Sequence, residues 1–128
     1  MKQDRSPRHR LFDILNSIHH IEKIVAGLDA NSFSADFVRY RAVERELEII
    51  SEASRSLSDA DKARFAEIPW RRIADIGNVL RHNYDDIAPA LVWEAVKNGL
   101  GPLKLAARTL YSESKRPADP WPDAEEQS

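Results

Sequence analysis

The chain has 128 residues, of which 42% are hydrophobic and 31% are charged, and none is a cysteine. This length and composition indicate one soluble globular domain, and the lack of cysteine excludes disulfides, thiolate metal sites and a cysteine nucleophile. The net charge of −2 excludes binding of nucleic acid through a broad positive field, so any such contact has to come from a local patch.

The first predicted element is a helix over residues 11–28, in which apolar residues recur every three or four positions. Gly27 and residues 29–31 are expected to end it. A second helix, over residues 37–57, is expected to begin after Ser34, whose hydroxyl can cap free backbone N–H groups. Ser58 and Asp59 then predict a short helix over residues 60–66.

A third long helix is expected to begin at Trp70, after Pro69, and to end within residues 83–86. The last helix runs from about Pro89 to Leu110 and contains Pro102, which predicts a kink or break near residues 98–102 because proline lacks a backbone N–H group. Together these elements form a domain over residues 1–112. Residues 113–128 are acidic and rich in proline, which predicts a mobile tail.

No segment alternates apolar and polar residues with the period of a strand. The predicted fold is therefore all-α, an up-down four-helix bundle with a short extra helix. No apolar run is long enough to cross a membrane, and the first ten residues contain no apolar stretch that would act as a secretion signal. We expect a cytoplasmic protein without a membrane partner.

One polar segment, residues 76–86, holds the side chains most suited to chemistry. It contains an arginine, a histidine, a tyrosine, two asparagines and two aspartates near a helix end. A purely structural interpretation is possible, in which Arg81 pairs with Asp85 and His82 interacts favourably with the helix dipole. In a continuous helix His82 and Tyr84 would point to opposite faces, so one shared site requires the helix to end or tighten there.

Several motifs in the sequence resemble the HepT-like family of the HEPN superfamily. They are the runs Leu47–Ala53, Ile68–Ala74 and Val92–Glu94, and the pattern Asn78-x-Leu80-x-His82-x-Tyr84. The resemblance covers roughly residues 10–110 and implies a small helical bundle that forms homodimers. It also implies a metal-independent endoribonuclease that needs no cofactor and acts as the toxin of a type VII toxin–antitoxin pair.

The resemblance further implies a partner, a minimal nucleotidyltransferase antitoxin of the MntA type, which neutralises the toxin by attaching AMP to the motif tyrosine. Carried onto this chain, His82 is the motif histidine, Tyr84 is the motif tyrosine and the AMPylation site, and Asn78 is the asparagine that follows the motif arginine. The family motif places that arginine five residues before the histidine, where this sequence has Gly77. Arg81 could supply the missing guanidinium, and Arg72 is a weaker substitute.

Residues of these types suit the cleavage of RNA without a metal. The ribose 2′-hydroxyl is the nucleophile, histidine can move its proton near neutral pH, and arginine can stabilise negative charge on the phosphate. The candidate catalytic residues are therefore His82, Arg81, Tyr84 and Asn78. AMP on Tyr84 would add negative charge and bulk beside His82, and both would oppose the approach of RNA.

A second hypothesis is a non-catalytic dimer that binds the nucleotidyltransferase, with nuclease activity lost together with the motif arginine. Harmless expression of the protein alone would favour it. Two other functions have little support in the sequence. No helix-turn-helix pattern indicates a DNA-binding protein, and no histidine, aspartate and glutamate spacing indicates a metal site, since adjacent His19 and His20 point apart on a helix.

Overall fold

The computed structural model describes residues 6–82 and 88–122. Within these residues the chain is all-α, as predicted, and has six helices and no strand. They are α1 (Arg8–Val25), α2 (Ala30–Ala35), α3 (Phe37–Arg55), α4 (Asp59–Ala63), α5 (Trp70–His82) and α6 (Ala88–Ser114). No helix in these residues is long and apolar enough to span a bilayer.

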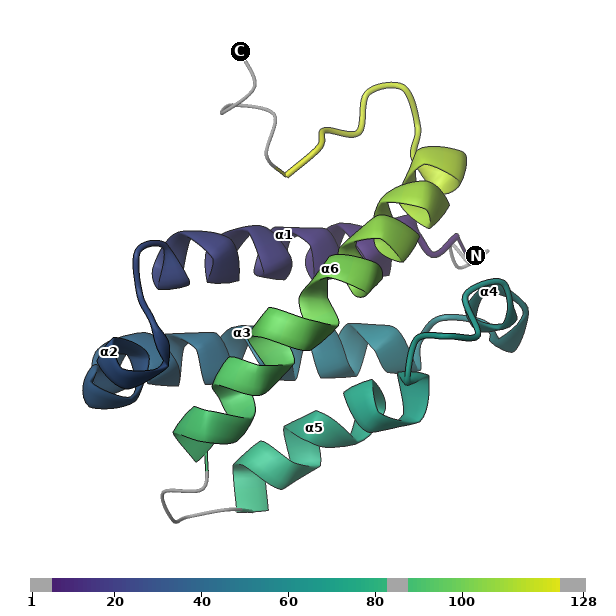
Figure 1. Cartoon of the computed structure of the whole chain (residues 1–128). Coiled ribbons are helices and arrows are strands. Elements are labelled where there is room, and N and C mark those ends of the chain that lie inside the picture. The colour runs from purple at the N-terminus through teal and green to yellow at the C-terminus, as the bar shows by residue number, and fades with distance from the viewer. Residues whose placement is uncertain (1–5, 83–87, 123–128) are drawn as a thin grey trace.

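The other three long helices, α1, α5 and α6, are arranged around α3. In Figure 1, α1 and α3 lie side by side, α6 crosses over both, and α5 lies along the opposite edge of α3. The apolar stripe of α1 faces this core, and Leu11, Ile14 and Ile21 are completely buried. Residues of α3 and α6, such as Ile50, Leu103 and Ala106, complete it. Burial of this stripe stabilises the long helices far more than their local sequence preferences do.

The connection between α1 and α3 differs from the prediction. Gly27 has a φ of +78°, a conformation that favours glycine, and it ends α1 as expected. The next residues form α2, a short helix that the sequence analysis did not predict. Its N-cap is Asp29, whose carboxylate accepts the backbone N–H of Ser32 at 2.8 Å. Asp36, and not Ser34, caps α3 by accepting the N–H of Arg39 at 3.1 Å.

The predicted break at Pro102 is wrong, because α6 continues through this residue from Ala88 to Ser114. Pro102, Asn98, Gly99 and Gly101 are all exposed, so the interruption faces solvent. The Asn98 carbonyl, which loses its usual partner at Pro102, can bind water there. The helix therefore remains continuous, and its opposite face stays buried in the core.

The segment after α6 packs against the bundle as far as Pro122. Residues 123–128 of the predicted mobile tail lie outside the described residues, and the mobility of residues 113–128 stays a prediction. The Trp121 ring lies edge-on to the Tyr111 ring, with centroids 5.1 Å apart, and the Arg108 guanidinium lies 4.5 Å from the Trp121 centroid. The Asp119 carboxylate accepts a hydrogen bond from Arg8 at 3.1 Å. These contacts join the C-terminal segment to the end of α6 and to the beginning of α1.

Candidate functional site

The candidate site begins where α5 crosses α3 closely, at Ser51 and Gly77. Both residues are buried. The Ser51 hydroxyl donates to the Ala74 carbonyl at 2.8 Å and accepts the backbone N–H of Gly77 at 3.3 Å. A Cβ atom on residue 77 would lie 3.0 Å from the Ser51 Oγ, closer than a side chain normally tolerates. A side chain at 77 would therefore require Ser51 or α5 to shift by a few tenths of an ångström, so the close approach of the two helices favours glycine there.

A second side chain of α3 fixes the same point of α5. The Arg55 guanidinium donates to the Ala74 carbonyl through Nε at 3.0 Å and through Nη2 at 2.6 Å. With the hydroxyl of Ser51, three donors from α3 converge on one carbonyl oxygen of α5. We call Ser51, Arg55, Ala74 and Gly77 the α3–α5 clasp. It fixes α5 about one turn before the candidate catalytic residues, because a helical turn is 3.6 residues.

Three of the four candidate catalytic residues lie together in the last turns of α5. Asn78, Arg81 and His82 are all exposed to solvent. A guanidinium nitrogen of Arg81 donates a short hydrogen bond to the Asn78 side-chain oxygen. His82 lies one turn after Asn78, so these two residues share a face of α5.

The direction of the Arg81 side chain is the main finding at this site. Its Nη1 atom lies 3.5 Å from the place that a Cβ atom on residue 77 would take. The side chain thus turns back along α5 and covers Gly77. The guanidinium occupies the region from which an arginine at position 77 would have extended. Arg72 does not share this position, since it precedes Gly77 by five residues and is exposed on another face of α5.

Tyr84, the fourth candidate, lies outside the described residues, as do Asn83 and Asp85. The structure therefore describes the histidine, arginine and asparagine of the predicted site. The expected pair of Arg81 with Asp85 also lies outside the described part of the chain.

Sequence reasoning missed a buried acid on the same side of α3. Glu44 lies two helical turns before Ser51, so both side chains share the face that contacts α5. Glu44 is 7% exposed, and its Oε1 atom has no hydrogen-bond partner among the described residues. Burial raises the pKa of the Glu44 carboxyl, and the hydrogen bond from Arg41 at 3.3 Å opposes this shift. The run of charged residues around Glu44 concealed it, because such runs are usually solvated.

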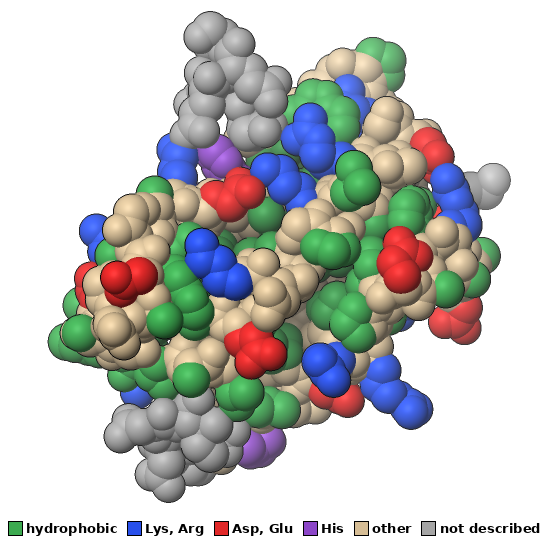
Figure 2. Space-filling model, viewed as in Figure 1, with side chains coloured by type: hydrophobic (Ala, Val, Ile, Leu, Met, Phe, Trp, Pro, Cys, Tyr) green, Lys and Arg blue, Asp and Glu red, His purple; other side chains and the backbone are tan. Residues whose placement is uncertain are grey.

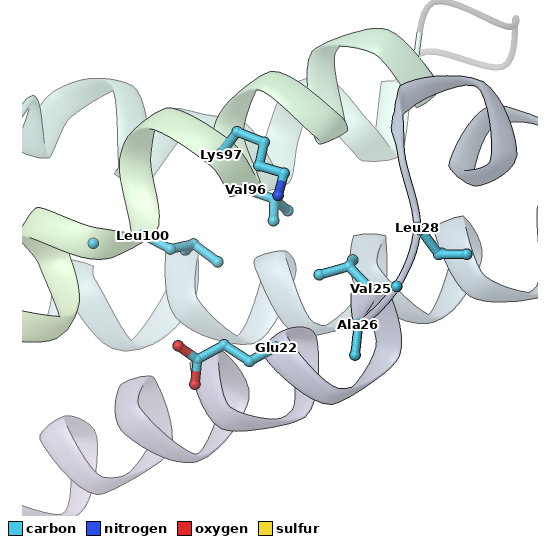
Figure 3. Close-up of a pocket in the computed structure, with 9 residues that line it drawn as sticks. Glu22, Val25, Ala26, Leu28, Val96, Lys97 and Leu100 are labelled. Atoms are coloured by element: carbon cyan, nitrogen blue, oxygen red, sulfur yellow. The ribbon is translucent and has the colours of Figure 1, made fainter.

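A hollow in the described surface lies elsewhere. It is a groove of about 350 Å³ between the end of α1 and the middle of α6 (Figure 3). Val25 and Leu28 lie on one side of it, and Val96, Lys97 and Leu100 on the other. None of the candidate catalytic residues lines it. In the described residues, no group of three or more histidine, aspartate and glutamate side chains is arranged to hold a metal ion.

Comparison with known proteins identifies the family. The sequence profile of the family described as Ribonuclease HepT-like matches residues 14–110. A provisionally named RNase of Methanocaldococcus jannaschii is 36% identical over 95 residues, which are 73% of this chain and 86% of the relative. A relative in Thermococcus cleftensis, named Probable ribonuclease HepT, is 35% identical over 100 residues, 78% of this chain and 91% of its own. No solved structure matches the chain at a significant level.

Proposed function

Because the chain belongs to the HepT-like ribonuclease family, we propose that it is a metal-independent endoribonuclease, and that it is the toxin of a type VII toxin–antitoxin pair. The observation that carries this proposal is the position of Arg81. Its guanidinium covers Gly77 beside Asn78 and His82 and can take the role of the missing motif arginine. Without it, the site would have a histidine but no cation beside it.

In the proposed reaction the 2′-oxygen of a ribose attacks the adjacent phosphorus atom. The bond from O2′ to phosphorus forms while the bond from phosphorus to O5′ breaks, which leaves a 2′,3′-cyclic phosphate and a free 5′-hydroxyl. His82 accepts the proton of the 2′-hydroxyl and, as imidazolium, returns it to the leaving O5′. DNA has no 2′-hydroxyl and is not a substrate. No cofactor takes part in these bond changes.

Arg81 stabilises the negative charge that develops on the phosphate oxygens in the transition state. A guanidinium suits this role because it stays charged at all relevant pH values and can donate two parallel hydrogen bonds. Asn78 positions it, since its side-chain oxygen accepts a hydrogen bond from Arg81. Both residues are exposed, so a phosphate can reach them from solvent.

Regulation of this activity would act at Tyr84. A minimal nucleotidyltransferase antitoxin of the MntA type transfers AMP from ATP to the tyrosine hydroxyl, forms an oxygen–phosphorus bond to the α-phosphate and releases pyrophosphate. The attached AMP adds a negative phosphate to a residue that follows His82 by two positions and Arg81 by three. Its charge repels RNA, and its bulk hinders approach to the site.

We further propose that the active form is a cytoplasmic homodimer. Two large apolar side chains, Val79 on α5 and Leu91 on α6, are 43% and 49% exposed. They flank the segment that connects α5 to α6, which is where a second copy would cover apolar surface beside the site. The apolar stripe of α1 is buried in the core of the protomer and is not available for such an interface.

The second candidate function is a non-catalytic dimer that binds the nucleotidyltransferase. Gly77 favours it, because this residue removes the motif arginine from its usual place. The two functions differ in what happens when the chain acts without its partner.

The decisive experiment compares wild-type protein with His82→Ala, both expressed alone in a bacterial host and both purified and incubated with RNA. We expect growth arrest and RNA fragments ending in 2′,3′-cyclic phosphate from the wild type only. His82 is exposed, so the substitution is not expected to disturb folding, and circular dichroism provides the control. Normal growth and intact RNA with the folded wild type would refute the nuclease and leave the binding dimer.

A further inference from the structure

Helix α5 presents an unusually basic face to solvent. It packs mainly against α3 and forms one edge of the molecule, below α3 in Figure 1. It holds three arginines, Arg71, Arg72 and Arg81, but only one carboxylate, Asp75. Figure 2 shows Lys and Arg side chains along this lower edge, over α5, with an acidic side chain among them. The net charge of the chain conceals this local patch.

The two arginines at the start of α5 also differ from most exposed arginines in their partners. Elsewhere, guanidinium nitrogens lie 3.6 Å or less from a carboxylate in pairs such as Arg39–Asp36, Arg45–Glu48 and Arg64–Glu113. No ion pair within residues 6–82 and 88–122 involves Arg71 or Arg72. Adjacent cations that form no ion pair among the described residues repel each other, so they contribute little to the fold and can bind an external anion.

Helix geometry aligns one of these arginines with the candidate site. Arg71, Asp75, Asn78 and His82 are spaced by four, three and four residues, so they form one stripe along α5. Arg71 and His82 are therefore separated by about 16 Å along the helix axis, at ~1.5 Å per residue. That length corresponds to about four or five nucleotides of a stacked strand, at ~3.4 Å each, and to fewer in an extended one.

We propose that the solvent face of α5 is a substrate track, on which Arg71 and Arg72 bind backbone phosphates of the RNA strand that is cleaved at His82. This inference rests on the proposed ribonuclease function and adds the part of the substrate that extends beyond the reacting phosphate. The strand runs along α5 from the clustered Asn78, Arg81 and His82 toward the beginning of the helix. Phosphate contacts carry no base information, so the track sets substrate length and not sequence.

Asp75 divides this track into two parts. Its carboxylate lies on the stripe between Arg71 and His82, and it repels any phosphate that passes directly above it. The RNA therefore contacts the protein at the two ends of the stripe and stands away from it in between. Removal of this charge should strengthen binding, which a purely structural role for α5 would not predict.

The test measures binding of a labelled single-stranded RNA of about ten nucleotides in the inactive His82→Ala background, so that cleavage does not interfere. We expect Arg71→Gln/Arg72→Gln to weaken binding by at least about fivefold, and to reduce the slope of log K against log salt by ~1.4, as loss of two single-strand phosphate contacts implies. Asp75→Asn should tighten binding by a few-fold.

The matched control is Arg10→Gln/Lys104→Gln, which removes the same charge from α1 and α6. The inference is overturned if this control weakens binding as much as the α5 variant does, or if the α5 variant keeps the wild-type salt slope. It is also overturned if Asp75→Asn weakens binding.

Cleavage of a dinucleotide and of the ten-nucleotide RNA by protein with intact His82 separates the track from the proposed nuclease function. If wild-type protein cleaves both RNAs and Arg71→Gln/Arg72→Gln loses the same fraction of its rate on each, only the track fails. If wild-type protein cleaves neither RNA, the proposed nuclease fails too.

Discussion

The backbone N–H of Gly77 points at the Ser51 hydroxyl across the crossing of α5 and α3, with nitrogen and oxygen 3.3 Å apart. This contact explains why the position of the motif arginine holds a glycine. A side chain at 77 would press on Ser51 and force a local shift, whereas an arginine one turn later can turn back and cover the same place. Gly77 and Arg81 therefore form one arrangement, in which the guanidinium covers the glycine.

Gly77→Ala is the direct test of this close crossing. Alanine is the better helix former by about 1 kcal/mol, but its Cβ atom would lie 3.0 Å from the buried Ser51 Oγ. Because that hydroxyl is held by two hydrogen bonds, we expect a net loss of about 1–2 kcal/mol in the free energy of unfolding, measured in urea. Combining it with Ser51→Ala should cost less than the sum of the two single changes. Additive costs would contradict the contact.

Arg81→Gln should reduce the rate of RNA cleavage about 10²–10³-fold, since it removes the cation that stabilises charge in the transition state. Arg81→Lys should recover part of the rate, because lysine keeps the charge but not the two parallel donors. Steady-state cleavage of a short RNA measures both, with Arg10→Gln on α1 as the control for general charge loss. Equal activity of Arg81→Gln and wild type would remove Arg81 from the catalytic residues.

Tyr84→Phe should abolish modification by the nucleotidyltransferase, because phenylalanine has no hydroxyl to accept AMP. Intact mass spectrometry after incubation with the partner and ATP should show the mass of AMP on the wild type and none on the variant. Addition of AMP to the phenylalanine variant would show that another residue is the modification site.

Glu44→Gln should stabilise the fold at neutral pH. Burial raises the pKa of the Glu44 carboxyl in the folded state, so the folded state binds its proton more tightly than the unfolded chain does. The free energy of unfolding therefore falls as pH rises from the ordinary glutamate pKa through the raised one. Glutamine has no charge to desolvate, so its gain in melting temperature should be larger at pH 7.5 than near pH 4.

The control for this experiment is Glu52→Gln, which changes a side chain of α3 that is 72% exposed. That variant should change the melting temperature little at either pH. A loss of stability in Glu44→Gln at pH 7.5 would mean that the charge of Glu44 is needed, and that its hydrogen bond with Arg41 outweighs the cost of burial.

Trp121→Ala should lower the free energy of unfolding by about 1–3 kcal/mol, because the ring packs against Tyr111 and under the Arg108 guanidinium. Trp121→Phe keeps an aromatic ring and should lose less. Urea unfolding followed by circular dichroism measures both changes. Unchanged stability in the alanine variant would show that residues 115–122 do not stabilise the bundle.

Much of the fold could be predicted from local sequence. The apolar periodicity of residues 11–28 and the turn at Gly27 placed the first helix, and Ser58 placed the short α4. The helix α2 was missed because six residues are too few to show a period, and only the contacts of Phe33 with the core reveal it. The break expected at Pro102 does not occur, because this side of α6 faces solvent. The local sequence could not show that orientation.

The sequence by itself determined the family and the identity of the chemical groups. The run from Asn78 to Tyr84 and the motifs around it depend only on the order of residues, and so does the replacement of the motif arginine by Gly77. Only the tertiary structure decided what that replacement means. Whether residue 77 can hold a side chain depends on the distance to Ser51, which is 26 positions away in the chain. Whether the Arg81 guanidinium can cover Gly77 depends on the rotamer of the Arg81 side chain. Neither that rotamer nor the distance to Ser51 can be read from the local spacing of residues.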